Sequence, residues 1–268
     1  LNVGVEGGSE AVLSDGFLGQ FGGSTRVTDY TFPLPEEIDR PAYADVIAKT
    51  HQEFARLINR ELRIGETQVV VGGDHAVALG SVAALLQRVP AAQVGYIQFD
   101  SHGDLHTFAS SPSGNFHGMW GRVIADKFDD PKIDGLVLHK LLPKQMLYIG
   151  NLQLEEAEEE FMQKQQIRRI GRAELVDAEQ VKAEIARFTR LYSHLHVSFD
   201  IDVFDRMLAP ATGTPAHDGL QWSEIASILT ILAGQVSLSV DLVEVNPEKE
   251  GAAKTVVTAQ RVLTSLLA

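Results

Sequence analysis

The chain has 268 residues, of which 44% are hydrophobic and 22% are charged, as in folded globular proteins, so disorder is excluded. Its 23 basic and 36 acidic residues give a net charge of −13, which argues against nucleic acid and anionic membrane as partners. The chain has no cysteine, so disulfides and thiolate metal ligands are excluded, and we expect a cytoplasmic location.

The hydrophobic pattern predicts an alternation of strands and helices. The chain begins at Leu1 without an initiator methionine, so we expect its N-terminus to be incomplete. Residues 1–35 are rich in glycine, and we expect loops with one short helix there. Apolar residues then recur at helical spacing over about 43–62. Beyond this helix we predict strands over 68–71, 93–99, 145–150, 194–199 and 236–243, and helices over 76–88, 117–128, 154–166, 178–188, 223–233 and 252–267.

Most of the predicted strands are continuous apolar runs, which is typical of strands buried on both faces. The pattern therefore predicts an α/β fold in which helices cover both faces of a mostly parallel sheet. No repeat or linker interrupts the pattern, so we expect one domain over residues 1–268. The acidic helix over 154–166 carries Glu155, Glu156, Glu158, Glu159 and Glu160, and we expect this run to be a solvated helix face.

Polar side chains cluster where the strand over 93–99 ends. Asp100, His102 and Asp104 occupy alternate positions, so in an extended chain they point to the same side. Carboxylate oxygen and imidazole nitrogen together suit a divalent metal such as Mn, Fe or Zn. One such triplet is also common in ordinary loops, so the other strand ends decide between the two interpretations.

Three further strands also end in unusual residues, and in open α/β sheets ligands bind at the carboxyl ends of strands. Together, His75, His102, Asp100, Asp104, Asp200 and Asp202 supply two imidazoles and four carboxylates. Four carboxylates carry too much negative charge for one cation, whereas the set suits two metals that activate a water for hydrolysis. The residues at these ends are His75, Asp200, Asp202 and Glu244.

Taken in order, these segments resemble the ureohydrolases, which include arginase and agmatinase. The resemblance covers about residues 65–268. The segments that carry it are Gly72-Gly73-Asp74-His75, Asp100-Ser101-His102-Gly103-Asp104, Ser113-Gly114-Asn115-Phe116-His117-Gly118, Ser198-Phe199-Asp200-Ile201-Asp202, Ala209-Pro210-Ala211-Thr212-Gly213-Thr214-Pro215 and Glu244-Val245-Asn246-Pro247.

The resemblance implies a three-layer α/β/α fold and two manganese ions per chain, although the ligand chemistry alone also admits Fe, Co or Ni. Six residues match the metal ligands of the family: His75, Asp100, His102, Asp104, Asp200 and Asp202. Among them, Asp100 and Asp200 match bridging positions. The implied reaction is attack of a metal-bridging hydroxide on a guanidinium carbon, which yields urea and an amine.

Three catalytic roles follow from the same resemblance. Asp104 matches the ligand that also holds the nucleophile and relays a proton. Glu244 matches the carboxylate that pairs with the guanidinium, where two parallel hydrogen bonds orient a planar cation. His117 matches the proton-shuttle histidine, and the pKa of a histidine lies near working pH.

The motif over 113–119 is more similar to arginases than to agmatinases. Ser113 and Asn115 match residues that hold the α-carboxylate of arginine, and Thr214 matches a residue near the guanidinium end. The resemblance thus implies hydrolysis of L-arginine to L-ornithine and urea. His106 and Glu155 also match substrate-binding positions, but arginases usually have asparagine and aspartate there.

Other substrates and other classes of protein stay open at the level of the sequence. Agmatine, another guanidino acid and formiminoglutamate are the alternative substrates. A catalytically silent relative tends to lose metal ligands, and a zinc deacetylase of similar architecture uses fewer ligands around one metal. The family also implies a small cationic guanidino substrate as partner and assembly into homo-trimers or homo-hexamers.

Overall fold

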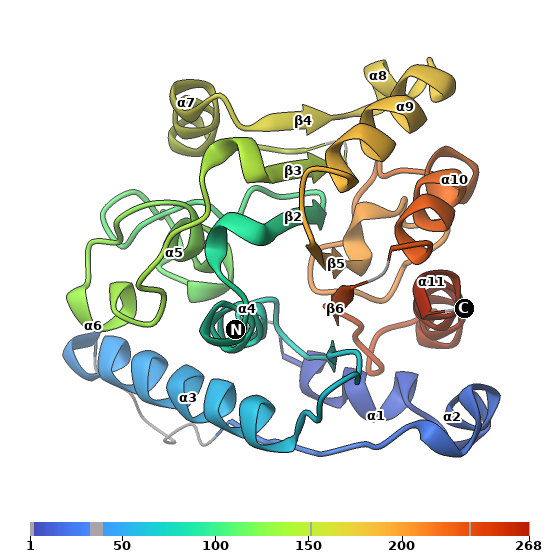
Figure 1. The fold of residues 1–268 in the computed structure, drawn as a ribbon, viewed down its shortest axis with the longest axis horizontal. Helices are drawn as coiled ribbons and strands as arrows, with labels where there is room; N and C mark the ends of the chain where they lie inside the picture. The colour runs from blue at the N-terminus through green and yellow to red at the C-terminus, as the bar shows by residue number, and fades with distance from the viewer. Residues whose placement is uncertain (1–2, 33–39, 151, 236, 268) are drawn as a thin grey trace.

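The computed structural model describes residues 3–32, 40–150, 152–235 and 237–267. Its centre is a six-stranded sheet in the order β1-β6-β5-β2-β3-β4, and every neighbouring pair is parallel (Figure 1). The predicted parallel α/β fold is therefore confirmed. The strands are β1 (Val69–Val71), β2 (Val94–Phe99), β3 (Met146–Ile149), β4 (Arg168–Ile170), β5 (His194–Asp200) and β6 (Leu238–Val243).

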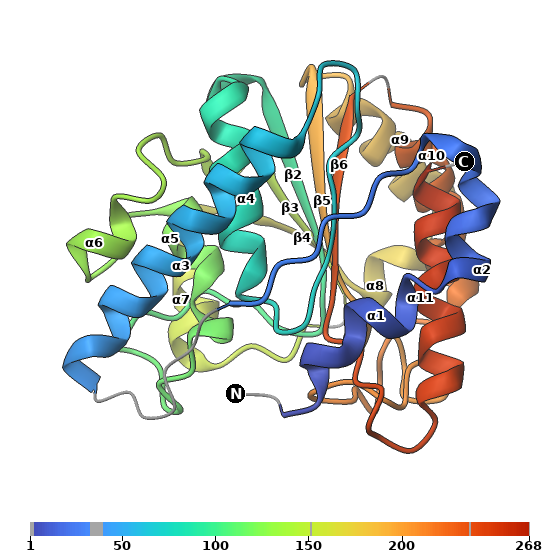
Figure 2. The same cartoon turned by 90° about the horizontal axis from the view of Figure 1, so that it is seen from below.

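Helices cover both faces of the sheet, which makes three layers (Figure 2). One face is covered by α3 (Arg40–Glu61), α4 (Val77–Arg88), α5 (Trp120–Ala125), α6 (Pro131–Asp134) and α7 (Glu156–Gln165). The other face is covered by α1 (Gly8–Val12), α2 (Asp15–Leu18), α8 (Arg172–Leu175), α9 (Ala178–Thr189), α10 (Trp222–Ala233) and α11 (Ala252–Leu267).

Strand β2 shows why both faces need a cover. Its residues alternate between two apolar clusters, because successive side chains of a strand point to opposite faces. Ile97 and Phe99 belong to the cluster under α9, α10 and α11, whereas Val94 and Tyr96 belong to the cluster under α3, α4 and α5. All six residues of β2 are buried, which fits the continuous apolar run in the sequence.

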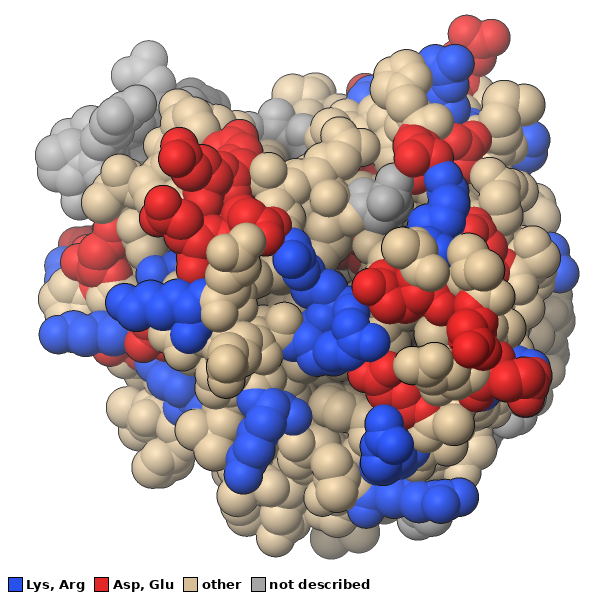
Figure 3. All heavy atoms as spheres, turned by 90° about the horizontal axis from the view of Figure 1, so that it is seen from above, with Lys and Arg blue, Asp and Glu red and all other residues tan. Residues whose placement is uncertain are grey.

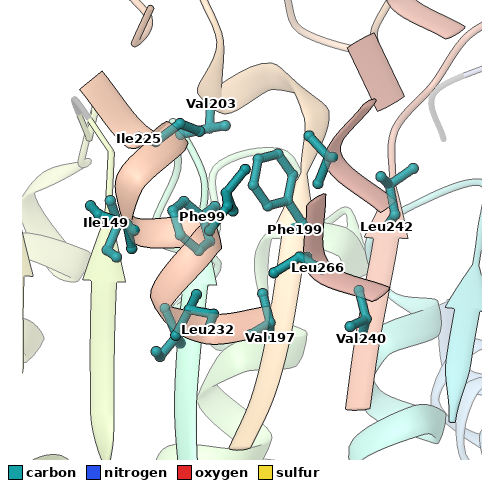
Figure 4. Packing of buried hydrophobic residues seen from close by; sticks show 14 of the residues in the cluster. Phe99, Ile149, Val197, Phe199, Val203, Ile225, Leu232, Val240, Leu242 and Leu266 are labelled. Atoms are coloured by element: carbon teal, nitrogen blue, oxygen red, sulfur yellow. The ribbon is translucent and has the colours of Figure 1, made fainter. Parts of the chain in front are cut away.

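The cluster under α10 and α11 is built from strand side chains that meet helix side chains (Figure 4). Phe99 of β2 stacks on Phe199 of β5, with ring centroids 4.8 Å apart. Leu232 of α10 and Leu266 of α11 close over these strands and are themselves buried. This packing fixes β2 and β5 side by side, and it is at their carboxyl ends that the polar residues gather.

Most predicted elements are present within two or three residues of their predicted ends, but several short elements were missed or misjudged. Residues 117–128 contain the six-residue helix α5 and the end of a 3-10 helix, not one continuous helix. Strand β4 was not predicted, since two of its three residues are arginines and only pairing with β3 makes it a strand. The short helices α6 and α8 were not predicted either.

The N-terminal segment holds two α-helices, α1 and α2, because Val12 and Phe17 pack into the cluster at α11. Val236, the predicted start of β6, lies outside the described residues.

The exposed edge of the sheet at β4 carries paired charges. Arg168 forms two hydrogen bonds to Glu184 of α9, at 2.6 and 2.9 Å, and Arg169 forms two to Glu159 of α7. Basic and acidic side chains are accordingly interspersed on the face seen in Figure 3. Charged side chains on a short edge strand hinder pairing with another chain. Among the described residues, no helix combines the length and the apolar character that crossing a membrane requires.

Candidate metal centre and active site

The order of the strands brings the polar strand ends together. Strands β1, β6, β5 and β2 are consecutive neighbours, so the segments that follow them leave the sheet at the same edge. His75 follows β1, Asp100 to Asp104 follow β2, Asp200 and Asp202 lie at the end of β5, and Glu244 follows β6. Residues up to 169 positions apart in the chain thereby come within hydrogen-bond distance.

A pocket of about 150 Å³ opens at this edge. Most of the residues that the sequence predicted for the site line it; Asp100 lies buried beneath the pocket, and Asn115 is not among the lining residues. The lining residues with a predicted role are His75, His102, Asp104, His106, Ser113, His117, Glu155, Asp200, Asp202, Thr214 and Glu244.

Two groups of side chains in the described part of the chain have the spacing of metal ligands, and they share Asp100. One group consists of His75, Asp100 and Asp200, and the other of Asp100, His102 and Asp202. Within each group the ligand atoms all lie within 4.8 Å of one another. Asp104 belongs to neither group, but its Oδ2 lies 2.9 Å from His75 Nδ1. Asp200, which matches a bridging position, belongs to the first group only.

His75 provides a test of whether a metal fits here. Its Nε2 hydrogen-bonds Ser198 Oγ at 2.9 Å, whereas its buried Nδ1 has no hydrogen-bond partner of good geometry within the described residues. This Nδ1 nonetheless faces the carboxylates of Asp100, Asp104 and Asp200 at 2.9 to 3.3 Å. A ring nitrogen surrounded by carboxylates is a suitable position for a cation, and the nitrogen and oxygen donors suit Mn, Fe, Co, Ni or Zn.

The pKa values of the carboxyl groups show an excess of buried negative charge. Burial, together with the charges of Asp202 and Asp100, raises the pKa of Asp200 well above its usual value. Burial also raises the pKa of Asp202. Burial acts in the same direction on Asp100, but the imidazoles of His102 and His75, at 3.5 and 3.1 Å from its carboxylate, outweigh burial and hold the pKa of Asp100 below its usual value. Divalent cations would relieve this repulsion between carboxylates.

A local turn fixes the aspartate at the end of β2 and the aspartate at the end of β5. Asp100 Oδ1 accepts a hydrogen bond from the His102 N–H at 2.7 Å, and Asp200 Oδ1 accepts one from the Asp202 N–H at 2.8 Å. Asp104 and Glu244 have backbone φ values of 55° and 65°, which residues other than glycine rarely adopt. Such strained backbone persists where the surrounding structure holds it, and it often marks functional sites.

Beside the metal-ligand groups, His117 pairs with Asp74. The distance between His117 Nδ1 and Asp74 Oδ2 is 3.1 Å. Burial lowers the pKa of His117, but the hydrogen bond and the charge of Asp74 outweigh burial and raise it above the usual histidine value. Both side chains are partly exposed, so this pair can exchange protons with solvent at the pocket.

A second cluster, formed by His106, Glu155 and Glu158, lies at another wall of the pocket. His106 Nε2 lies 3.0 Å from Glu155 Oε2, and His106 Nδ1 lies 3.1 Å from Ser110 Oγ. Glu155 is exposed, as predicted for the acidic helix. The prediction of a solvated face was wrong for Glu158, which is only 4% exposed.

Glu158 is buried because its carboxylate accepts backbone hydrogen bonds. The N–H of Leu105 donates to it at 3.0 Å, and the N–H of Glu155 donates at 3.2 Å. Burial raises the pKa of Glu158. The remaining residues of the predicted substrate loops, Ser113 and Thr214, are exposed at the rim of the pocket.

Three residues of the site were missed in the sequence: Asp74, Trp120 and Glu158. Trp120 Nε1 donates to Asp104 Oδ2 at 2.9 Å and thereby fixes this carboxylate. Asp74 stands next to His75 in the glycine-rich turn, but its pairing with His117 bridges 43 positions. No local signal marks Trp120 or Glu158, because their partners come from other elements.

Comparison with known proteins agrees with this geometry. The model of the arginase family matches residues 21–268. The chain is 30% identical to the arginase of Bacillus caldovelox over 231 residues, which is 82% of this chain and 75% of that protein. It is 29% identical to the arginase of Entamoeba histolytica over 264 residues, which is 92% of this chain and 87% of that protein.

Solved structures give the same result. The crystal structure of Entamoeba histolytica arginase in complex with L-ornithine matches with a TM-score of 0.83 and 26% identity, over 99% of this chain and 93% of that one. Arginase from Bacillus subtilis matches with a TM-score of 0.88 and 26% identity, over 98% and 92%. The sheet order, the site at its carboxyl edge and these matches lead to one conclusion: the chain belongs to the arginase family.

Proposed function

We propose that this protein hydrolyses L-arginine to L-ornithine and urea at a centre of two manganese ions. The observation that carries the proposal is the pair of ligand groups that share Asp100 and open into one pocket with Glu244 and His117. The arginases of the comparison, one of them with L-ornithine bound, support the choice of substrate. We further propose one catalytic domain over residues 1–268 and assembly into trimers or hexamers, as the family resemblance implies.

The residues that would hold the metal ions are His75, Asp100, His102, Asp104, Asp200 and Asp202. When bound, two divalent cations would lower the pKa of a water molecule enough to make it a nucleophile at neutral pH. Trp120 holds Asp104 at the wall of the pocket through its indole N–H. Asp104 is therefore fixed where it can accept a proton during the reaction.

Glu244 is assigned to bind the guanidinium group. Its Oε1 accepts a hydrogen bond from the backbone N–H of His75 at 2.8 Å, which fixes the carboxylate beside the first ligand group. A fixed carboxylate can orient a planar guanidinium through two parallel hydrogen bonds. The guanidinium carbon then faces the metal ligands, and the substrate chain leads toward the rim of the pocket.

His117 is assigned to deliver a proton to the leaving amine. Addition of water to the guanidinium carbon and cleavage of the C–N bond release the amine, which must gain a proton as it departs. The raised pKa of His117 keeps more of its protonated form available near neutral pH. Asp74 thus supports the reaction through the charge that it places beside His117.

Replacing Asp74 with asparagine is expected to move the alkaline limb of the pH–rate profile to lower pH. The variant lowers the pKa of His117, so the protonated form is lost at lower pH. The pair of His117 and Asp74 also stabilises the folded protein. This stabilisation is fully present below the usual histidine pKa and is lost as the pH rises through the raised pKa of His117. The measurement is kcat/KM against pH, with the exposed Asp45→Asn as control. An unchanged alkaline limb in Asp74→Asn would remove Asp74 from this role.

The amino acid part of the substrate is assigned to the predicted substrate loops, which contribute His106, Ser113, Asn115 and Glu155; Thr214 is assigned to the guanidinium end. Replacing Glu155 with glutamine is expected to raise KM for arginine roughly fivefold to tenfold, because an ionic hydrogen bond to the α-amino group is lost. A guanidino acid without an α-amino group, 5-guanidinopentanoate, is expected to keep its kcat/KM unchanged. Glu156→Gln, at the next exposed position, is the control. Equal effects on arginine and 5-guanidinopentanoate would contradict the assignment.

The test of the proposed function is urea release by manganese-loaded protein from arginine, agmatine and other guanidino acids, with formamide release from formiminoglutamate in parallel. We expect turnover of arginine to exceed that of the other compounds. Comparable activity on agmatine and arginine would contradict carboxylate recognition by Ser113 and Asn115. The number of metals per chain gives a second test, because one metal would favour the deacetylase class and none a silent relative.

A further inference from the structure

Strand β2 carries a row of buried polar side chains that the proposed reaction does not use. Tyr96 and Gln98 precede Asp100 at alternate positions, so all three lie on the same face of the sheet. In the register of the sheet, Gln98 pairs with Ser198 of β5. Tyr96, Gln98 and Ser198 are all 0% exposed, and none of them lines the pocket. Polar groups buried in this way require partners.

Hydrogen bonds join these side chains into a chain that begins and ends at a metal ligand. His75 Nε2 lies 2.9 Å from Ser198 Oγ, and Ser198 lies within hydrogen-bonding reach of the Tyr96 hydroxyl. The Tyr96 hydroxyl donates to Gln98 Oε1 at 2.7 Å. Gln98 Nε2 donates to Asp100 Oδ2, also at 2.7 Å. His75 and Asp100 are members of the same metal-ligand group.

The chemistry of the groups fixes the direction of every bond. A carboxylate only accepts, so Gln98 must turn its NH₂ to Asp100 and its carbonyl oxygen to Tyr96. Tyr96 must then donate its O–H to Gln98 and accept from Ser198. Ser198 uses its O–H to donate a hydrogen bond to Tyr96, so its oxygen accepts the hydrogen bond from His75 Nε2–H. The Nε2–H of His75 is therefore engaged by Ser198, and Nδ1, which faces the carboxylates of the centre, is the nitrogen left for a metal.

We propose that Ser198, Tyr96 and Gln98 are positioning residues that form a hydrogen-bonded relay between His75 and Asp100. The relay selects the His75 tautomer that can bind a metal through Nδ1, and it fixes the rotation of the Asp100 carboxylate. This inference rests on the proposed function, because it assumes a metal ion at the group of His75, Asp100 and Asp200. Partners behind metal ligands commonly orient them in this way.

The surroundings keep the relay rigid. The Tyr96 ring stacks on His196 of β5, with centroids 5.8 Å apart and an interplanar angle of 15°. His196 is in turn hydrogen-bonded to Asp241 and Ser239, each at 2.8 Å. The ring of Tyr96 therefore has little freedom to turn its hydroxyl away. If Tyr96 loses its hydroxyl, Gln98 Oε1 has no hydrogen-bond donor, and the side-chain amide of Gln98 can flip.

The strand beside β2 offers a matched control. Tyr148 of β3 is also 0% exposed and packs against Tyr96, with centroids 6.4 Å apart. Unlike that of Tyr96, its hydroxyl makes no hydrogen bond within the described residues. Removal of the hydroxyl at each position therefore compares a relay member with a tyrosine of similar burial outside the relay.

The experiment is calorimetric titration of the metal-free full chain with Mn²⁺, together with the melting temperature of the metal-free protein. Tyr96→Phe is expected to weaken one Mn²⁺ site by about 10- to 100-fold. Gln98→Leu is expected to have a similar effect and serves as the second variant. The double variant is expected to bind no more weakly than Gln98→Leu, since one break already interrupts the relay. Tyr148→Phe is expected to bind Mn²⁺ like the unmodified protein.

A different pattern would overturn the relay. If Tyr96→Phe and Gln98→Leu bind Mn²⁺ as the unmodified protein does and only the melting temperature falls, the hydrogen bonds serve the fold alone. If Tyr148→Phe weakens binding as much as Tyr96→Phe, the effect belongs to packing. In either case, the proposed function stands if the unmodified protein binds two manganese ions and releases urea. An unmodified protein that binds no manganese overturns the proposed function, and the relay with it.

Discussion

Replacement of Asp100 by asparagine is expected to abolish binding of both metal ions and, with it, urea release. Asp100 is the one residue that belongs to both ligand groups found in the described residues. The substitution keeps the shape of the side chain but removes its charge, and a neutral amide is a weaker ligand for a divalent cation. Loss of a partner behind a ligand already costs about 10- to 100-fold in affinity, so we expect more than about 100-fold here.

The measurement for Asp100→Asn is the metal content per chain after dialysis, together with the rate of urea release. Asp202→Ala removes a ligand from one group only, so we expect it to abolish activity while it retains more metal than Asp100→Asn. Asp241→Asn is the matched control, because Asp241 is equally buried in β6 but pairs with His196 and Ser81. It is expected to lower the melting temperature and keep both metals. Two metals bound to Asp100→Asn with ordinary affinity would refute a shared site.

Replacement of Gly150 by alanine is expected to destabilise the fold more than any other glycine substitution near the site. A Cβ atom at Gly150 would lie 1.8 Å from the carbonyl oxygen of Asp100, which is part of the backbone and cannot rotate away. Strands β2 and β3 would have to separate at their carboxyl ends. Overpacking of this kind costs about 3 kcal/mol or more of unfolding free energy. For a chain of this size we expect a fall in melting temperature of about 6–12 °C.

Thermal unfolding of the metal-free protein measures this effect, and Gly16→Ala is its control. A Cβ atom at Gly16, in helix α2, would meet nothing within 4 Å, so the melting temperature is expected to stay constant or rise slightly. Gly150→Ala should also weaken metal binding, because the displaced carbonyl belongs to Asp100. An unchanged melting temperature in Gly150→Ala would show that the two strand ends approach each other less closely than described.

The sequence allowed most of the fold to be predicted because the elements carry strong local signals. The run Val94–Phe99 is apolar except for Gln98, and helix α11 begins and ends at the predicted residues. Where local signals are weak, the prediction failed. The arginines of β4 do not favour a strand, and helices α1 and α2 depend on the packing of Val12 and Phe17 against α11. Tertiary contacts decide the conformation of such short segments.

The six residues predicted as metal ligands could be found in the sequence because each stands at or next to a strand end. The partners that fix them could not be found in this way. Trp120 reaches Asp104 from helix α5, and Ser198 reaches His75 from β5 across 123 positions. Glu158 has the sequence context of an exposed helix face, and only the approach of the backbone at Leu105 gives its carboxylate a partner.

By itself, the sequence determined the parallel α/β architecture, the resemblance to the ureohydrolases and the identity of the candidate ligands. These properties depend on residue type, spacing and order along the chain. Only the tertiary structure decided that, of the two predicted bridging residues, Asp100 and not Asp200 is shared by the two ligand groups, that Asp74 pairs with His117 and that a hydrogen-bonded relay joins His75 to Asp100. The physical reason is that these properties depend on distances and directions between atoms of different strands and helices, which the register of the sheet and the packing of the helices set.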